Sequence, residues 1–211
     1  MAMLGPALTT LAPVLARLQQ IITITLLLVA LAWSGWTLAQ GRWILALIGV
    51  AVLAGGHALF LALECSWMSW SNRRDTIPPG KARDVLAAWF GEALCAPRIF
   101  CWQQPFRAHA WPDRMSGRPG QRGVVLVHGL VCNRGLWNRW YPRLAEAGIP
   151  FVGVNLEPVF GDIDRCVGPI DAAIDALQKV TGLAPVVVAH SMGGLAVRAW
   201  LRSQEIGRAH V

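Results

Sequence analysis

A serine lies where a run of β-branched residues meets a cluster of small ones, in the segment Val186-Val187-Val188-Ala189-His190-Ser191-Met192-Gly193-Gly194. The pattern is typical of a nucleophile elbow, in which a serine occupies a sharp turn between a buried strand and a helix. We expect Ser191 to adopt a strained backbone conformation that holds its hydroxyl clear of the sheet. A helix N-terminus would favour the negative charge that develops when this hydroxyl attacks a substrate. The alternative is a glycine-rich turn that only leads into a helix.

The small residues around this serine have a steric explanation. The strand and the helix of an elbow pass so close that larger side chains at Ala189, Gly193 or Gly194 are expected to collide. These three positions are therefore predicted to require small residues.

A second motif lies upstream, where the apolar run Gly123–Val127 ends in His128-Gly129-Leu130. Continuous apolar runs predict strands that are buried on both faces of a parallel sheet. The spacing of apolar residues and the glycine stops predict these further elements: helix 136–144, strand 150–156, helix 168–181, strand 185–189 and helix 195–200. The alternating order of strands and helices predicts a parallel sheet with right-handed crossovers.

Residues 123–202 resemble the first half of an α/β-hydrolase, on the lipase and esterase side of that superfamily. The resemblance depends on His128-Gly129 after the first strand, on Ala189-His190-Ser191-Met192-Gly193-Gly194 at the turn, and on the spacing between them. It covers 80 of the 211 residues. The fold class that it implies is the N-terminal half of an α/β-hydrolase parallel sheet, preceded by two transmembrane helices.

The resemblance also implies a role for each site residue. Ser191 would attack an acyl carbonyl, and the backbone N–H groups of Leu130 and Met192 would form the oxyanion hole. His128 and His190 would pack or form hydrogen bonds around the turns instead of acting as the base, which must reach the serine from another loop. The expected elbow and turn residues are His128, Gly129, Ala189, His190, Gly193 and Gly194. Neither a metal nor a cofactor is expected.

The expected catalytic acid and base are missing from the sequence. In this superfamily they follow the serine, in the order acid and then histidine. Only 20 residues follow Ser191, and they include Glu205 and His210 where the elbow helix should continue. Residues 205–211 are also what the start of a common sequencing adapter would encode, so we expect a truncated chain with a non-native tail, inactive as it stands. The alternative is a natural helix tail.

Two uncharged apolar runs, Ile21–Ala39 and Trp43–Leu63, predict a transmembrane hairpin with helices at about 20–39 and 43–64. Only Gln40-Gly41-Arg42 separates them, and the cluster Ala54-Gly55-Gly56 is expected to let the helices pack closely. The rival interpretation of the first run is a cleaved signal peptide, which the second run directly behind it disfavours.

Positive charge predicts the orientation of this hairpin. The basic residues that flank the two runs on their outer ends are Arg17, Arg73, Arg74, Lys81 and Arg83. The connecting turn has only Arg42, so the positive-inside rule places both ends and the hydrolase domain on the cytoplasmic side of a bacterial inner membrane. The five cysteines, an odd number without metal-like spacing, are expected to be free thiols in a reducing compartment.

The segment 66–121 is basic and contributes much of the net charge of +7. We expect an amphipathic helix around Val85–Leu94, on the membrane or over the sheet, and an antiparallel edge hairpin at Arg98–Ala110. An anionic membrane surface explains the charge, and nucleic acid is not an expected partner because no binding motif accompanies it. The expected divisions of the chain are 1–65 with the hairpin, 66–121 as linker, 122–204 as partial hydrolase domain and 205–211 as tail.

Three functions remain open from the sequence. The first is a membrane-anchored serine hydrolase that cleaves lipid or other hydrophobic acyl esters through Ser191. The second is an acyltransferase on the same scaffold, in which an alcohol replaces water. The third is a non-catalytic membrane protein that uses a hydrolase-like domain for binding.

Overall fold

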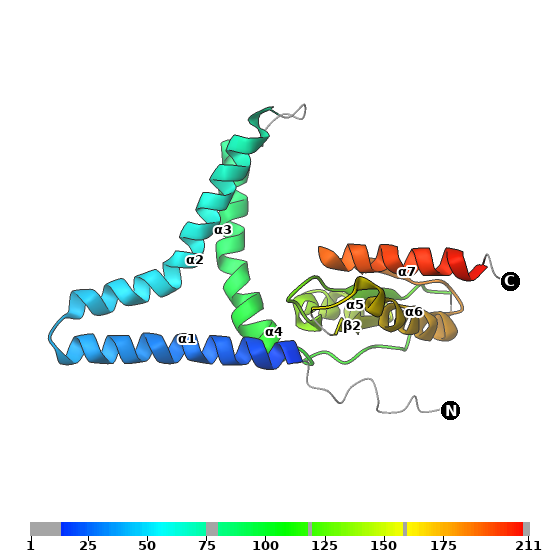
Figure 1. The fold of residues 1–211 in the computed structure, drawn as a ribbon. Coiled ribbons are helices and arrows are strands. Elements are labelled where there is room, and N and C mark those ends of the chain that lie inside the picture. Colours follow the sequence, from blue (N-terminus) through cyan, green and yellow to red (C-terminus); the bar gives the residue numbers. More distant parts are fainter. Residues whose placement is uncertain (1–13, 75–79, 118–119, 158–159, 209–211) are drawn as a thin grey trace. The chain divides into compact units, whose positions relative to one another are not determined.

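The computed structural model describes residues 14–74, 80–117, 120–157 and 160–208 (Figure 1). In chain order, the elements are α1 (Val14–Ala39), α2 (Trp43–Ser71), η2 (Asn72–Arg74), α3 (Ala82–Arg98), η3 (Ile99–Gln103), α4 (Gln104–Arg107), β1 (Val124–Val127), η4 (Arg134–Trp137), α5 (Tyr141–Glu146), β2 (Phe151–Val154), η5 (Ile163–Cys166), α6 (Val167–Thr181), β3 (Val186–Ala189) and α7 (Met192–Arg208). The chain is a mixed α/β protein in which helices predominate and three strands form one small parallel sheet.

The described residues divide into two compact units. The sheet unit consists of the residues up to Gln19 together with those from Trp102 onward, and the helical unit is Gln20–Cys101. The first turns of α1 therefore belong to the sheet unit, whereas the division expected at residue 65 falls inside α2.

The sheet has the strand order β2-β1-β3, with every pair parallel. Val124 of β1 pairs with Phe151 of β2 on one side and with Val186 of β3 on the other. All three strands lie where the β-branched runs predicted them, because such side chains fit a pleated surface. Most residues of β1 and β2 are buried as expected, but β3 is an outer strand without a fully buried residue, and its Val186 is 50% exposed. The parallel sheet predicted from the sequence is thereby confirmed.

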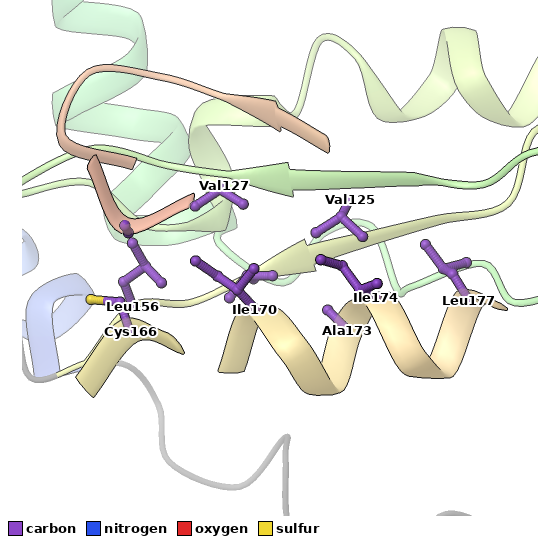
Figure 2. Close-up of a cluster of buried hydrophobic side chains, with 10 residues drawn as sticks. Val125, Val127, Leu156, Cys166, Ile170, Ala173, Ile174 and Leu177 are labelled. Atoms are coloured by element: carbon purple, nitrogen blue, oxygen red, sulfur yellow. The ribbon is translucent and has the colours of Figure 1, made fainter. Parts of the chain in front are cut away.

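Helices cover both faces of the sheet. Alternate residues of β1 point to opposite faces: Val125 and Val127 contact α6, whereas Leu126 packs with Trp137 and Tyr141. Figure 2 shows the first of these clusters, with side chains of α6 aligned beneath the strands. Its α6 members are Ile170, Ala173, Ile174 and Leu177. Burial of each large aliphatic side chain here contributes about 2 kcal/mol, so this face supplies much of the unit's stability.

The helix between β1 and β2 differs from its prediction. Instead of one helix over 136–144, the chain forms the 3-10 turn η4 and then the short helix α5. Pro142 has no N–H to donate to a carbonyl of the preceding turn, so a new helix begins around it. The predicted end of α6 is confirmed, since Gly182 caps it in the left-handed conformation at φ 72°.

A partly buried ion pair attaches η4 to the neighbouring strand. Arg134 Nη2 donates to Asp113 Oδ1 at 2.7 Å, and the same carboxylate oxygen accepts the Gly153 N–H of β2 at 3.0 Å. The pair thus joins three segments that are distant in the sequence.

In the helical unit, α1 and α2 confirm the two predicted apolar helices and are longer than the predicted spans. Their close contact lies elsewhere than expected. Trp33 Nε1 donates to the Leu45 carbonyl at 3.0 Å, and a Cβ atom at Gly49 would meet the Trp33 indole. By contrast, a Cβ atom at Gly55 or Gly56 would meet no atom within 4 Å, so these glycines do not mediate the packing.

The edge hairpin predicted at Arg98–Ala110 is wrong, because helix α3 continues through the π-helical turn η3 into α4. The segment lacks a glycine or asparagine that would form a hairpin turn, and Ile99 is its only β-branched residue. The helix predicted around Val85–Leu94 is confirmed. Within the described residues, three helices are long and apolar enough to cross a membrane: Val14–Ala39, Trp43–Ser71 and Ala82–Arg107.

Candidate active site

Ser191 occupies the turn between β3 and α7, with its backbone in the left-handed region at φ 55°. Positive φ is uncommon in a residue other than glycine and is a form of strain that concentrates at functional sites. The turn is held by backbone hydrogen bonds: His190 N–H donates to the Val127 carbonyl and Gly193 N–H to the His190 carbonyl, both at 3.0 Å. The strained turn predicted from the sequence is present, and it leaves Ser191 exposed.

Two glycines permit the close approach of this turn to β1. A Cβ atom at Gly193 would lie 2.5 Å from the His128 carbonyl oxygen, and one at Gly129 would lie 2.9 Å from Ser191 Cβ. The steric requirement predicted at Gly193 is confirmed. The one predicted at Gly194 is wrong, since a Cβ atom there would meet no atom within 4 Å. The side chain of Ala189 is exposed, so the tight contact is confined to the start of α7.

The site lies where the connections of the sheet diverge. The chain leaves β1 toward the face covered by Tyr141 of α5, and it leaves β3 toward the face covered by α6 and Ala196 of α7. In open α/β sheets, ligands bind in the crevice outside the carboxyl ends of strands at such a point. The His128-Gly129-Leu130 segment and Ser191 follow these two adjacent strand ends.

In the described part of the chain, two backbone N–H groups that follow these strand ends have no acceptor. Within the described residues, neither the Leu130 N–H nor the Met192 N–H donates to any acceptor. Met192 is the first residue of α7, whose helix dipole favours negative charge at that end. Two free donors beside a serine hydroxyl are what stabilisation of an oxyanion requires.

His128 is a buried neutral residue that shapes the turn. Its Nε2 atom accepts the Leu156 N–H at 3.0 Å, so the proton is on Nδ1, which donates to the Gly129 carbonyl at 2.9 Å. The pKa of His128 is lowered from 6.5 to about 4, mainly by burial and to a smaller extent by the nearby His190, while the hydrogen bond to Gly129 partly opposes this shift. Both ring nitrogens are therefore occupied, which leaves His128 no means to act as a base. His190 is exposed, and its Nδ1 atom would lie 3.2 Å from a Cβ atom at Gly129.

The pKa of His128 predicts a loss of stability in mild acid. The unfolded chain binds a proton at this residue below pH 6.5, whereas the folded protein resists protonation down to about pH 4. His128 therefore makes its full contribution to the free energy of unfolding above pH 6.5. This contribution decreases by about 3 kcal/mol in total as the pH falls toward 4. Thermal unfolding of His128→Gln should show a weaker pH dependence over this window than the wild type. His109, whose pKa burial also lowers, stays in both proteins, so an unchanged pH dependence would contradict the assignment.

Three buried amide side chains, none of which is predicted from the sequence, hold the loop that follows β1. Gln19 of α1, Gln104 of α4 and Asn133 of the loop are hydrogen-bonded to one another. The loop also contains Val131 at φ 55°, a strained conformation for a β-branched residue. The only sequence signal for Gln19 was a polar residue at the beginning of an apolar helix, which does not identify its partners.

Within the described residues, the Ser191 hydroxyl has no hydrogen bond to a histidine or a carboxylate. Across residues 14–74, 80–117, 120–157 and 160–208, no hydrogen bond joins a histidine to a carboxylate, and no group of three potential metal ligands occurs. Glu205 is part of α7, and His210 lies outside the described residues. The five cysteines are free, and burial raises the pKa of Cys132 and Cys166, which keeps these two thiols protonated.

The structure thus places Gly129 against Ser191, and the predicted donors Leu130 and Met192 are the next residues along the chain from these two. The His128 side chain joins the segment after β1 to the segment after β2, through its hydrogen bonds to the Gly129 carbonyl and the Leu156 N–H. Comparisons with protein-family models, with curated proteins and with solved structures find no match to this chain.

Proposed function

We propose that this chain is part of a membrane-anchored serine hydrolase of the α/β-hydrolase type, lipase- or esterase-like, that cleaves hydrophobic acyl esters. The main support is the backbone at Ser191, a non-glycine residue at φ 55° between a parallel strand and a helix. The strand order β2-β1-β3, with the elbow on an outer strand, is consistent with the first half of such a sheet.

The chemistry follows from the position of the serine. Ser191 Oγ attacks the carbonyl carbon of the ester while its proton passes to a general base, and the Leu130 and Met192 N–H groups bind the resulting oxyanion. Collapse of this intermediate expels the alcohol, which takes up the proton, and leaves an acyl-serine that water then hydrolyses. Because a serine without a base is a poor nucleophile, we expect the histidine and its carboxylate partner to come from residues outside the described structure.

The surroundings of Ser191 favour a hydrophobic substrate. Leu130 and Val131 are 46% and 39% exposed, and Leu195, one helical turn beyond the serine, is 54% exposed. An exposed apolar rim around a nucleophile suits an acyl chain that leaves a bilayer. A membrane anchor would keep the enzyme next to such substrates.

The connectivity of the units supports two membrane crossings. The chain leaves the sheet unit after Gln19 and returns to it at Trp102, and within that unit Gln19 Nε2 donates to Gln104 Oε1 at 3.3 Å. A chain that leaves one side of a bilayer and returns to the same side crosses it an even number of times. We assign the crossings to α1 and α2, because α3 is the least apolar of the three candidates and contains four charged residues. We propose that the sheet unit lies on the cytoplasmic side of a bacterial inner membrane, because basic residues flank the outer ends of this pair.

A charged fluorophosphonate that cannot cross membranes tests both parts of the proposal. The protein expressed from its complete gene should react in inside-out vesicles and not in sealed right-side-out vesicles, and peptide mapping should locate the phosphonate on Ser191. A membrane-permeant probe serves as the control and should react in both preparations. Modification of another serine, or no reaction with the permeant probe, would overturn the catalytic assignment, whereas the reverse sidedness would overturn only the orientation.

A further inference from the structure

The loop between β1 and η4 carries one of the two proposed oxyanion donors and contains a strained residue. Leu130 supplies the N–H group, and Val131 directly after it has φ 55°. A β-branched residue adopts this conformation only where its surroundings impose it. The Val131 carbonyl shares a peptide group with the Cys132 N–H, which donates to the Gly129 carbonyl at 3.3 Å. The Gly129 carbonyl in turn shares a peptide group with the Leu130 N–H and also accepts from His128 Nδ1 at 2.9 Å. A contact to the Val131 carbonyl therefore acts on the direction of the Leu130 N–H through the Cys132–Gly129 hydrogen bond.

A side chain from helix α1 makes this contact. Gln19 Nε2 donates to the Val131 carbonyl at 3.2 Å and to Gln104 Oε1 at 3.3 Å. Gln19 Oε1 in turn accepts from Asn133 Nδ2 at 3.2 Å. Both the nitrogen and the oxygen of the Gln19 amide thus have hydrogen-bond partners, and all of these groups belong to the sheet unit.

The amides beneath the loop form one connected network. Gln104 Oε1 also accepts the Asn133 N–H at 2.8 Å, and Asn133 Nδ2 donates to the Gln104 carbonyl at 2.9 Å. Asn133 Oδ1 accepts the Gly135 N–H at 2.8 Å, which begins η4. All three amide side chains are buried: Gln19 is 6% exposed, Gln104 0% and Asn133 1%. Water therefore does not replace a lost partner, and each broken hydrogen bond would be costly, which holds the loop in one conformation.

We infer that Gln19, at the base of membrane helix α1, is a positioning residue that holds the oxyanion-binding loop in its active conformation through the Val131 carbonyl. This inference depends on the proposed function for its catalytic consequence. It gives the membrane helix a second role, because α1 then anchors the enzyme and also completes its active site. Gln19 acts only through the loop and does not touch the substrate.

Two variants of Gln19 test the inference. Gln19→Met keeps the length and helix propensity of the side chain but removes every hydrogen bond, and Gln19→Glu keeps the shape but replaces both donated hydrogen bonds by contacts between oxygen atoms. Gln178→Leu, at an exposed position of α6 in the same unit, is the matched control. All are made in the protein expressed from its complete gene and purified in detergent.

The expected result is a fall in kcat without a matching change in KM. Loss of one oxyanion donor lowers kcat about 10²–10³-fold, so a displaced Leu130 N–H should lower kcat for a short-chain nitrophenyl ester by about 10- to 100-fold in both variants. KM should change less than about threefold, because the oxyanion forms only after binding. Gln178→Leu should match the wild type.

Hydrogen exchange supplies a readout that does not depend on catalysis. Amide exchange in a peptide that covers residues 129–135 should become faster in both Gln19 variants, while a peptide from α6 stays unchanged. Unchanged exchange in 129–135, or an unchanged kcat, would overturn the inference. Equal acceleration in the α6 peptide would also overturn it, because Gln19 would then support the whole unit and not the loop. If the wild type fails to react at Ser191, the proposed function is wrong, and the exchange measurement alone decides whether Gln19 positions this loop.

Discussion

Replacement of Ser191 by alanine is expected to lower the kcat of ester hydrolysis by about 10⁶-fold, the magnitude seen when a catalytic nucleophile is removed from a serine enzyme. The alanine keeps the elbow and both N–H donors but has no oxygen to attack the substrate. Binding of a non-reactive substrate analogue should therefore change little. The measurement is steady-state hydrolysis by the protein expressed from its complete gene, with burst kinetics to detect the acyl-enzyme.

The control for this variant is another serine on the same helix. Ser203 Oγ donates to the Trp200 carbonyl at 2.6 Å, within α7. Ser203→Ala should retain wild-type kcat, because this hydroxyl only bonds to its own helix. Turnover by Ser191→Ala within about tenfold of the wild type would refute the nucleophile assignment, whatever the effect of Ser203→Ala.

Replacement of Gly193 by alanine is expected to destabilise the sheet unit by about 3 kcal/mol, at the upper end for an overpacked core. The new methyl group would lie 2.5 Å from the His128 carbonyl oxygen and 2.9 Å from that of Val127. Both oxygens belong to the main chain at the end of the central strand, so neither can move without disturbing the sheet. Thermal unfolding in detergent measures the loss, and reaction with fluorophosphonate should fall because the turn that presents Ser191 is displaced.

The adjacent glycine offers a matched control. A Cβ atom at Gly194 would meet no atom within 4 Å, and the residue lies in the first turn of α7. Gly194→Ala should leave labelling unchanged and raise stability by up to about 1 kcal/mol, since alanine favours a helix over glycine. If the two substitutions had the same effect, the close contact between α7 and β1 would not be what holds the elbow.

The elements that the sequence predicted well have local causes. Runs such as Val186–Val188 favour strands through the shape of their own side chains, and Gly182 ends α6 because glycine adopts positive φ without steric cost. The turn at Ser191 belongs partly to this group, since Gly193 is its neighbour in the chain, whereas the second glycine that allows it, Gly129, comes from the end of β1. For these features, a short window of sequence contains most of the physical information.

The wrong predictions concern features that depend on partners. The hairpin predicted at Arg98–Ala110 is an exception, because the segment's own residues lack a turn former and continue the helix of α3. Gly55 and Gly56 resemble a helix-packing motif, but Gly49 is the one that lies against Trp33. Gly194 resembles Gly193 in sequence and differs only because β1 lies against one and not the other. Composition identifies candidates for close contact, and the packing of another segment selects among them.

From the sequence alone came the three parallel strands, the apolar helices and a serine in a strained turn, because each is encoded by the periodicity or the steric limits of adjacent residues. The folded chain was needed to show what holds the loop beside that serine. Gln19 and Asn133 are 114 positions apart and form a hydrogen bond at 3.2 Å. A contact between two buried amides leaves no periodic pattern in either segment, since each side chain is unremarkable until the fold brings its partner within reach.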